Sequence, residues 1–246
     1  MSDVVSVRCL RGMASLVAAQ RLDVRVDGLQ HVPPSGPALL VCRHYHHLYD
    51  GCALLAVIPR PLALVVGLDW VRHAWNRRLM EFACRAAGWP VVLRAERLQD
   101  GVGAYRPEDA RRYLRTALRT ADATLAASGA LAIFPEGYPT IDPNGSPKAD
   151  DRAILPFRSG FLHMVERAQR VGTTPIPIIP TGLSYTPGSR WQVVLRFGAP
   201  LFHRQRSQRA VDLAAVEAAV RRLSSPGAVW AGLPAGVSGL AGEHPF

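Results

Sequence analysis

The stretch that decides the fold is ALLVCRHYHHLYDG, from Ala38 to Gly51. Its apolar beginning follows a turn with three prolines at residues 33–37, which predicts a buried strand over Ala38–Arg43. A helix is predicted to follow from about Tyr49 to Val57. In open α/β sheets, ligands bind beyond the carboxyl ends of the strands. The polar residues between this strand and this helix are therefore the first candidate site.

On both sides of this stretch, short apolar runs alternate with helical patterns, which is typical of an α/β domain. Residues 138–156 contain four prolines and an Asn-Gly pair, so we expect a long loop, and such loops are often functional. The apolar stripe from Leu213 to Leu223 predicts a last helix that faces the core. Further strands are predicted over residues 62–68, 90–93, 130–134, 175–185 and 191–197, and further helices over residues 71–87, 107–127 and 157–171.

No internal repeat or linker divides the 246 residues, so we expect a single domain over residues 22–224. An amphipathic segment, residues 1–21, precedes it, and a Gly-, Ala- and Pro-rich tail, residues 225–246, follows it. The longest apolar runs, such as Cys52–Ile58, fall far short of the ~20 residues that a spanning helix needs. The four cysteines form no C-x-x-C pair and no signal peptide is recognisable, so we expect a cytoplasmic protein.

The net charge of +10 is carried almost wholly by arginine, because Lys148 is the only lysine among 29 basic residues. Coding bias in a chain rich in Ala, Gly, Pro and Val explains part of this imbalance. The excess charge lies in two blocks, Arg72–Arg119 and Arg190–Arg222. Such blocks can bind nucleic acid, an anionic membrane surface or a phosphorylated substrate. Aromatic residues make up only 7% of the chain, which weakens the nucleic-acid interpretation.

Three histidines, His44, His46 and His47, and Asp50 fall within seven residues. One imidazole held by one carboxylate suffices for a general base, because the carboxylate fixes the tautomer and stabilises the imidazolium. A metal site is the other interpretation, since His44 and His46 resemble the start of the H-x-H-x-D-H run of metallo-β-lactamases. Asp50 falls one place too late for that run and no second cluster supplies ligands, so we expect no metal.

Three further segments carry candidate residues at predicted strand ends. The sequence FPEG at residues 134–137 places Glu136 beside Gly137. The sequence GWPVVLR, which begins at Gly88, ends in Arg94, with Arg97 close behind. The sequence IIPTG, which begins at Ile178, is an apolar strand that ends in a turn.

In this order and at these separations, the segments resemble the glycerolipid acyltransferases, above all the 1-acyl-glycerol-3-phosphate acyltransferases. That family carries N-H-x4-D after a strand, then G-x-(I/F)-P-V-x-R, F-P-E-G and V-P-(I/V)-x-P. Between the last two, LPFRSGF at residues 155–161 resembles the family's L-P-F-K-x-G stretch. The resemblance covers roughly residues 22–200. It implies a glycerol-3-phosphate acyltransferase-like fold, with a mixed, mostly parallel central sheet flanked by helices.

The first motif departs from the family pattern. His44 follows the strand as the family's catalytic histidine does, but Asp50 is six residues away rather than five. His46 is four residues from Asp50, which on a continuous helix would put both side chains on one face. We favour His44 because the strand fixes its position, and His46 remains the alternate base. Arg43 stands where the family has asparagine.

The resemblance implies acyl transfer from acyl-CoA or acyl carrier protein to a hydroxyl of a lysophospholipid such as 1-acyl-glycerol-3-phosphate. His44 or His46 would take the hydroxyl proton and Asp50 would orient the ring, without a cofactor, a metal or a covalent enzyme intermediate. Arg94, Arg97 and Arg158 would hold the acceptor's phosphate, and Glu136 and Gly137 would shape the pocket around the glycerol.

The lipid substrate implies peripheral association with the inner face of the cell membrane. The helix faces over Arg106–Arg119 and Arg204–Arg222 would suit an anionic lipid surface. Three alternatives stay open. The first is a non-phosphate acceptor, such as a glycolipid or a pigment alcohol, and the second is a hydrolase that uses the same His/Asp pair on water. The third, in a different class, is a basic nucleic-acid-binding domain, which the order of the motifs disfavours.

Overall fold

The computed structural model of the chain describes residues 2–98, 103–171 and 175–225. The predicted tail, residues 225–246, lies outside the described residues from residue 226 onward.

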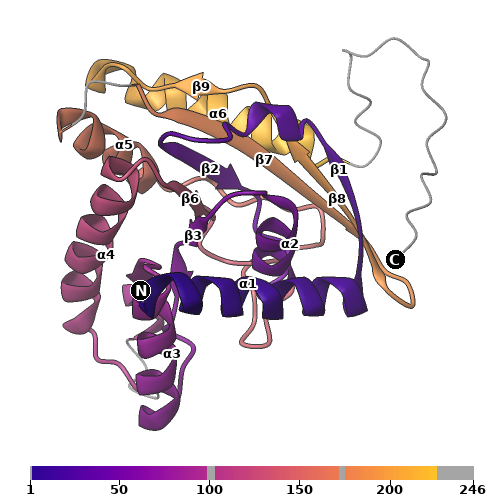
Figure 1. Cartoon of the computed structure of the whole chain (residues 1–246), viewed down its shortest axis with the longest axis vertical. Helices are drawn as coiled ribbons and strands as arrows, with labels where there is room; N and C mark the ends of the chain where they lie inside the picture. The colour runs from indigo at the N-terminus through magenta and orange to yellow at the C-terminus, as the bar shows by residue number, and fades with distance from the viewer. Residues whose placement is uncertain (1, 99–102, 172–174, 226–246) are drawn as a thin grey trace.

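The main sheet contains seven strands, and β2 (Ala38–Cys42) lies between β6 and β7. Both neighbours run parallel to β2, and β3 runs parallel to β6. The strand β8 is antiparallel to β7, and it pairs in parallel with β1 at the edge (Figure 1). The remaining strands are β1 (Leu22–Asp27), β3 (Leu62–Leu64), β6 (Ala130–Ile133), β7 (Pro177–Thr186), β8 (Trp191–Phe197) and β9 (Leu201–Phe202), the last of which is antiparallel to β7.

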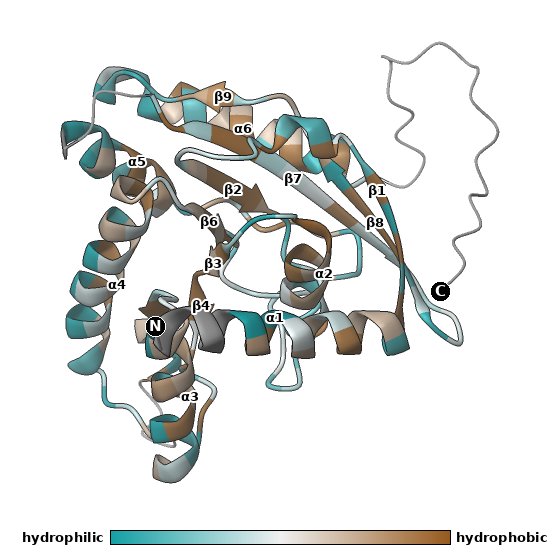
Figure 2. Ribbon diagram, in the orientation of Figure 1, coloured by the Kyte–Doolittle hydropathy of each residue, from teal (hydrophilic) through white to brown (hydrophobic). Residues whose placement is uncertain are grey.

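The mixed, mostly parallel sheet flanked by helices confirms the predicted fold class. All five residues of β2 are fully buried, as expected for a central strand with both faces covered. On one face Leu40 packs in a cluster with Leu54, and on the other Leu39 packs with Phe161. Figure 2 shows β2 and β6 in brown, as hydrophobic strands.

The described residues form six α-helices, and all but α3 cover the main sheet. Clusters of buried side chains place α1 and α2 on one face and α4, α5 and α6 on the other. The predicted α6 stripe does face the core, because Val216 and Val220 are buried. The helices are α1 (Ser2–Arg21), α2 (Tyr49–Val57), α3 (Ala74–Ala86), α4 (Asp109–Ala126), α5 (Gly160–Val171) and α6 (Arg209–Leu223).

The strand predicted over residues 62–68 is divided in two. The strand β6 ends at Ile133, and the carbonyl of Phe134 accepts the N–H of Gly137 at 3.1 Å in the turn that follows, so it is not free to extend the ladder with β3. The chain therefore leaves β6 after Leu64, and β4 (Val66–Gly67) pairs instead with β5 (Val91–Val92) in a separate two-stranded sheet. This pair directs the segment that ends in Arg94 toward the carboxyl ends of the main strands.

Candidate active site

The candidate residues gather at the carboxyl ends of adjacent parallel strands. His44 follows β2, and Glu136 and Gly137 follow β6. Asp50 lies in the first turn of α2, which returns across this edge of the sheet. The structure thus places these segments at one edge of the sheet, as the sequence predicts.

The Asp50 carboxylate is completely buried and receives four hydrogen bonds. Its Oδ2 accepts from Nδ1 of His44 at 2.8 Å and from the backbone N–H groups of Tyr45 at 2.7 Å and His46 at 3.1 Å. Its Oδ1 accepts from the hydroxyl of Tyr185 at 2.7 Å. Burial raises the pKa of Tyr185 well above its usual value, so this hydroxyl stays protonated and donates. The carboxylate is thereby fixed in position.

The bond to Asp50 sets the tautomer of His44. With the ring proton on Nδ1, Nε2 carries a lone pair. Nε2 has no hydrogen-bond partner among the described residues, and the side chain is 16% exposed. The ring stacks on Phe134 with centroids 4.4 Å apart, which holds its plane. This is the arrangement of an oriented base with one open nitrogen.

His46 occupies a different environment. Its Nδ1 accepts the backbone N–H groups of Leu48 at 3.2 Å and Tyr49 at 3.3 Å, at the start of α2. Burial, with a smaller contribution from His47, lowers the pKa of His46 from 6.5 to about 4. The neutral ring therefore serves as an acceptor for otherwise unpaired N–H groups at the helix start, and it does not contact the Asp50 carboxylate through its side chain.

The extra residue between His44 and Asp50 lies in an extended segment. His46 forms an isolated parallel bridge with Ile141. The carbonyl of Tyr45 accepts the N–H of Ile141 at 2.7 Å, and the N–H of His47 donates to the carbonyl of Ile141 at 3.1 Å. The long loop over residues 138–156 thus pairs with the first motif, which accommodates the six-residue spacing.

Glu136 and Lys148 hold the backbone of His44 from both sides. The carboxylate of Glu136 accepts the N–H of His44 at 2.7 Å, and Lys148 donates to the carbonyl of His44 at 2.6 Å. The two side chains are also ion-paired at 2.6 Å, and both are almost fully buried, with 1% of Lys148 and none of Glu136 exposed. Burial lowers the pKa of Lys148, and Glu136 opposes that shift.

Sequence reasoning missed Lys148. The available signal was its uniqueness, since one lysine stands among 28 arginines and lies in the loop beside FPEG. Arg43, in the family's asparagine position, is buried and donates to the carbonyls of Leu183 at 3.1 Å and Asp151 at 2.5 Å. It therefore ties β2 to β7 and to the long loop.

The three candidate phosphate ligands lie close to one another, and each has a protein partner. Arg94 pairs with the buried Asp69 at 2.6 Å and donates to the carbonyl of Gly137 at 2.6 Å. The guanidinium groups of Arg94 and Arg97 both lie over the ring of Tyr138, at 4.4 and 5.0 Å.

Arg97 also donates to the carbonyl of Gly145 at 2.5 Å, and it lies 3.8 Å from the carboxylate of Asp142. Arg158 pairs with Glu96 and is the most exposed of the three, at 57%. The guanidinium of Arg158 also lies beside Gly137, because a side chain added there would meet its Cζ at 3.7 Å. The structure thus brings the three arginines together around Gly137 and Tyr138.

Two kinds of feature are absent from the described part of the chain. No group of three His, Cys, Asp or Glu side chains in that part is arranged to hold a metal ion. None of its helices has the length and apolar character needed to cross a membrane.

Comparisons with known proteins identify the family and the fold of the chain. A family model described as acyltransferase matches residues 23–184. Among solved structures, the chain is similar to the crystal structure of PlsC, the 1-acyl-sn-glycerophosphate (LPA) acyltransferase from Thermotoga maritima, with a TM-score of 0.56 and 17% identity. That likeness covers 89% of this chain and 81% of the other, and at this identity it shows the fold alone. No curated protein matches.

Proposed function

Because the chain belongs to the acyltransferase family, we propose that it transfers a fatty acyl group from acyl-CoA or acyl carrier protein to a hydroxyl of a lysophospholipid. A 1-acyl-glycerol-3-phosphate is the acceptor that fits the motif resemblance. The observation that carries the proposal is the His44–Asp50 pair, with Nδ1 bound and Nε2 open.

In the proposed reaction, Nε2 of His44 takes the proton of the acceptor hydroxyl as the oxygen attacks the thioester carbonyl. The new C–O bond forms, the C–S bond breaks, and the proton passes from the imidazolium to the departing thiolate. Asp50 stabilises the imidazolium, and Tyr185 keeps Asp50 in place. Glu136 and Lys148 fix the backbone that carries the ring, and this differs from the pocket-shaping role expected for Glu136.

The acceptor's phosphate would lie against the arginines around Gly137. A guanidinium can bind two phosphate oxygens at once. Arg158 is the best placed to exchange partners, because its pair with Glu96 is exposed on both sides. Arg94 is held by buried Asp69 and contributes its charge without changing partners. We propose a location at the inner face of the cell membrane, where the lipid acceptor lies.

A non-phosphate acceptor is the second candidate. Arg94, Arg97 and Arg158 each face a carboxylate, so part of the positive charge is already neutralised. A glycolipid or a pigment alcohol needs the same base and no phosphate site. The variant Arg158→Gln distinguishes the two kinds of acceptor. It should raise KM for a phosphorylated acceptor, and it should leave KM unchanged for an uncharged one.

The test is incubation of the purified chain with acyl-CoA or acyl carrier protein and a panel of acceptors, with release of free thiol as the readout. The panel contains lysophosphatidic acid, a zwitterionic lysolipid, a glycolipid and a pigment alcohol. We expect the fastest release with lysophosphatidic acid. If no acceptor in the panel gives thiol release, the proposal is contradicted. Release of free fatty acid without an acceptor identifies a hydrolase instead.

A further inference from the structure

The outer side of α3 exposes large apolar side chains that nothing in the described structure covers. Trp75 is 66% exposed, Leu79 is 52% exposed and Phe82 is 68% exposed. Their spacing of four and three residues puts them on one face of the helix. Single exposed apolar residues are ordinary, but three large ones side by side mark an interaction surface.

Arginines border these apolar side chains. Arg78 and Arg85 are exposed, and because they are seven residues apart they lie on the same side of α3. We call the exposed side chains of Trp75, Arg78, Leu79, Phe82 and Arg85 the α3 face. The structure describes the whole of α3, and none of its exposed side chains is acidic.

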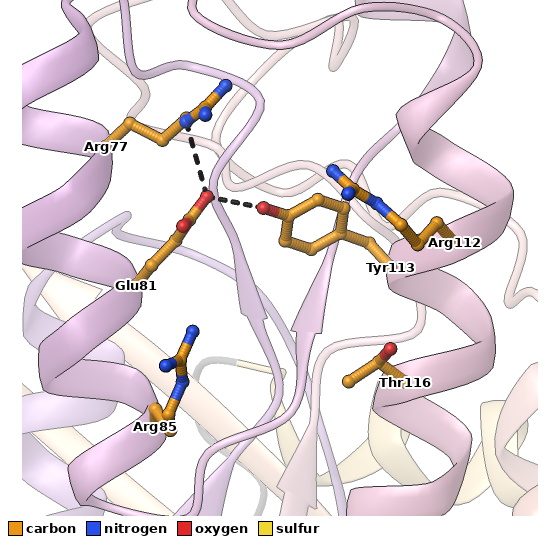
Figure 3. A pocket seen from close by; sticks show the side chains of 6 residues that line it. All are labelled: Arg77, Glu81, Arg85, Arg112, Tyr113 and Thr116. Carbon is orange, nitrogen blue, oxygen red and sulfur yellow. Dashed lines mark hydrogen bonds and ion pairs between the residues drawn. The ribbon is translucent and has the colours of Figure 1, made fainter.

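The acidic residue of α3 is turned away from this face. Figure 3 shows Glu81 in the cleft between α3 and α4, where it accepts the hydroxyl of Tyr113 and lies 3.5 Å from Arg77. Arg85 and Arg112 also line this cleft, from opposite helices. The cleft is therefore cationic overall, and Arg85 connects it to the α3 face.

We propose that the α3 face docks the protein onto an anionic lipid surface. The three apolar side chains would enter the boundary between headgroups and acyl chains, where tryptophan is favoured. The arginines would meet lipid phosphates, which a guanidinium binds bidentately. Through this surface the protein would reach a lipid substrate. The purpose of docking therefore rests on the proposed function, but the binding itself does not.

The charge of the α3 face favours a lipid surface over a second copy of this chain. A two-fold pairing would place the same patch on both subunits, and it would bring Arg78 and Arg85 toward their own copies without an acid between them. A nucleic acid would neutralise the arginines but would leave Leu79 and Phe82 in water. An anionic bilayer satisfies both kinds of side chain.

The α3 face also differs from the two helix faces predicted to suit anionic lipid, Arg106–Arg119 and Arg204–Arg222. The first of these exposes one large apolar side chain, Leu114. The block over Arg190–Arg222, which contains the second face, exposes Arg204 and Arg222, but the only large apolar side chains exposed there among the described residues are Phe202 and Val211. Charge alone gives about 1 kcal/mol per basic residue near an anionic surface. The α3 face adds three large exposed apolar side chains to its arginines, more than either of these helix faces exposes, so we expect docking there.

The experiment is co-sedimentation of the full chain with vesicles of phosphatidylcholine, alone or mixed with phosphatidylglycerol. The variant Trp75→Ser/Leu79→Ser/Phe82→Ser should lose binding to mixed vesicles by about tenfold or more per side chain. The variant Arg78→Glu/Arg85→Glu should lose at least about fivefold per arginine, and only on mixed vesicles. Because these side chains point outward, the melting temperature should stay near that of the wild type.

Matched controls come from the Arg190–Arg222 block. Phe202→Ser/Val211→Ser and Arg204→Glu/Arg222→Glu remove the same kinds of exposed side chain and should change binding by less than about twofold. Wild-type binding by the α3 variants overturns the proposal. So does light scattering that shows the α3 variants converting a dimer to a monomer, or binding to RNA that disappears in the same variants while vesicle binding persists.

Binding is measured without turnover, so this test is independent of the acyltransferase assay. If the chain binds vesicles through α3 but releases no thiol, the proposed function fails and the docking surface stands. If the α3 variants keep thiol release with monomeric short-chain substrates and lose it with vesicle substrates, both hold. Equal loss with both kinds of substrate, with vesicle binding unchanged, overturns the docking surface.

Discussion

His44, after β2, and His203, after β9, are both held by carboxylates, but the two rings leave different atoms open. His44 contacts one carboxylate, through Nδ1, and is 16% exposed. His203 contacts two, with Nδ1 at 2.6 Å from Asp212 and Nε2 at 3.0 Å from Glu166, and it is 1% exposed. Arg209 is the main cause that lowers the pKa of Glu166 to about 2, so this carboxylate is charged.

The difference separates a ring that has a nitrogen open to a substrate proton from a ring that is held at both nitrogens. A general base needs one free nitrogen within reach of a substrate, and only the His44 ring has one. With both nitrogens occupied, His203 instead connects β9 to α5 and α6, which carry Glu166 and Asp212. A histidine close to a carboxylate is therefore not enough to identify a general base. The ring must also have a nitrogen that is free to take a proton.

The largest effect is expected at Asp50. In Asp50→Asn, the side-chain oxygen can still accept from His44 and the two backbone N–H groups, while the amide can donate to Tyr185. The fold should therefore be retained, while the charge that stabilises the imidazolium is lost. We expect kcat to fall by about 10²- to 10⁴-fold, measured as thiol release by folded protein. Asp212→Asn, the matched change beside His203, should leave kcat unchanged, and equal losses in the two variants would break the comparison.

The next effect is expected at Lys148, a positioning residue. Lys148→Met frees the carbonyl of His44 and leaves Glu136 without its cation, so the ring should be misplaced. We expect kcat to fall by about 10- to 100-fold with little change in KM, and Lys148→Arg to recover part of the loss.

Arg60 is the matched control for Lys148. It is a buried cation that donates to the carbonyls of Pro33, Gly36 and Ser128, none of which belongs to the candidate site. Arg60→Met should lower the melting temperature without changing kcat of the folded protein. If Lys148→Met behaves in the same way, Lys148 has only a structural role.

A smaller effect, on stability alone, is expected at His203. Glutamine cannot bridge Asp212 and Glu166 as the imidazole does, so His203→Gln should lower the free energy of unfolding by about 1–3 kcal/mol. Denaturant titration measures this loss, and kcat of the folded fraction should not change. The exposed His73, changed to Gln, is the control. A loss of kcat in His203→Gln would remove the distinction between the two histidines.

The last effect is confined to acidic pH, and it concerns the stability that the neutral His46 ring contributes. The pKa of His46 is about 4 in the folded protein and about 6.5 when unfolded, so between these values only the unfolded chain binds the proton. Stability should fall as the pH drops from 6.5 to 4, by up to about 1.4 kcal/mol per pH unit from this group. His46→Gln should flatten that slope in urea titrations, and an unchanged slope would contradict the buried, neutral ring.

The sequence was most informative where the structure depends on local pattern. The bounds of α2 and β8 agree with their predictions, because apolar periodicity and flanking turns determine them. The strand β1 was not predicted, although its alternation of Leu22, Val24 and Val26 was a signal for an edge strand.

Partners that meet across the fold could not be predicted. Tyr185 reaches Asp50 across 135 positions and Lys148 reaches the His44 carbonyl across 104, and no spacing rule links such pairs. The pairing of Arg94 with Asp69 likewise depends on the β4–β5 pair, which the prediction of one strand over residues 62–68 obscured.

The central claim is that His44, and not His46, takes the proton. Its most direct test is thiol release by His44→Ala and His46→Ala, measured side by side on folded protein at a temperature well below the melting temperature of either variant. We expect His44→Ala to lose about 10²- to 10⁴-fold in kcat. His46→Ala should lose only the stability of the helix start, about 0.5–2 kcal/mol, and keep its kcat. Turnover retained by His44→Ala and abolished by His46→Ala would contradict the account.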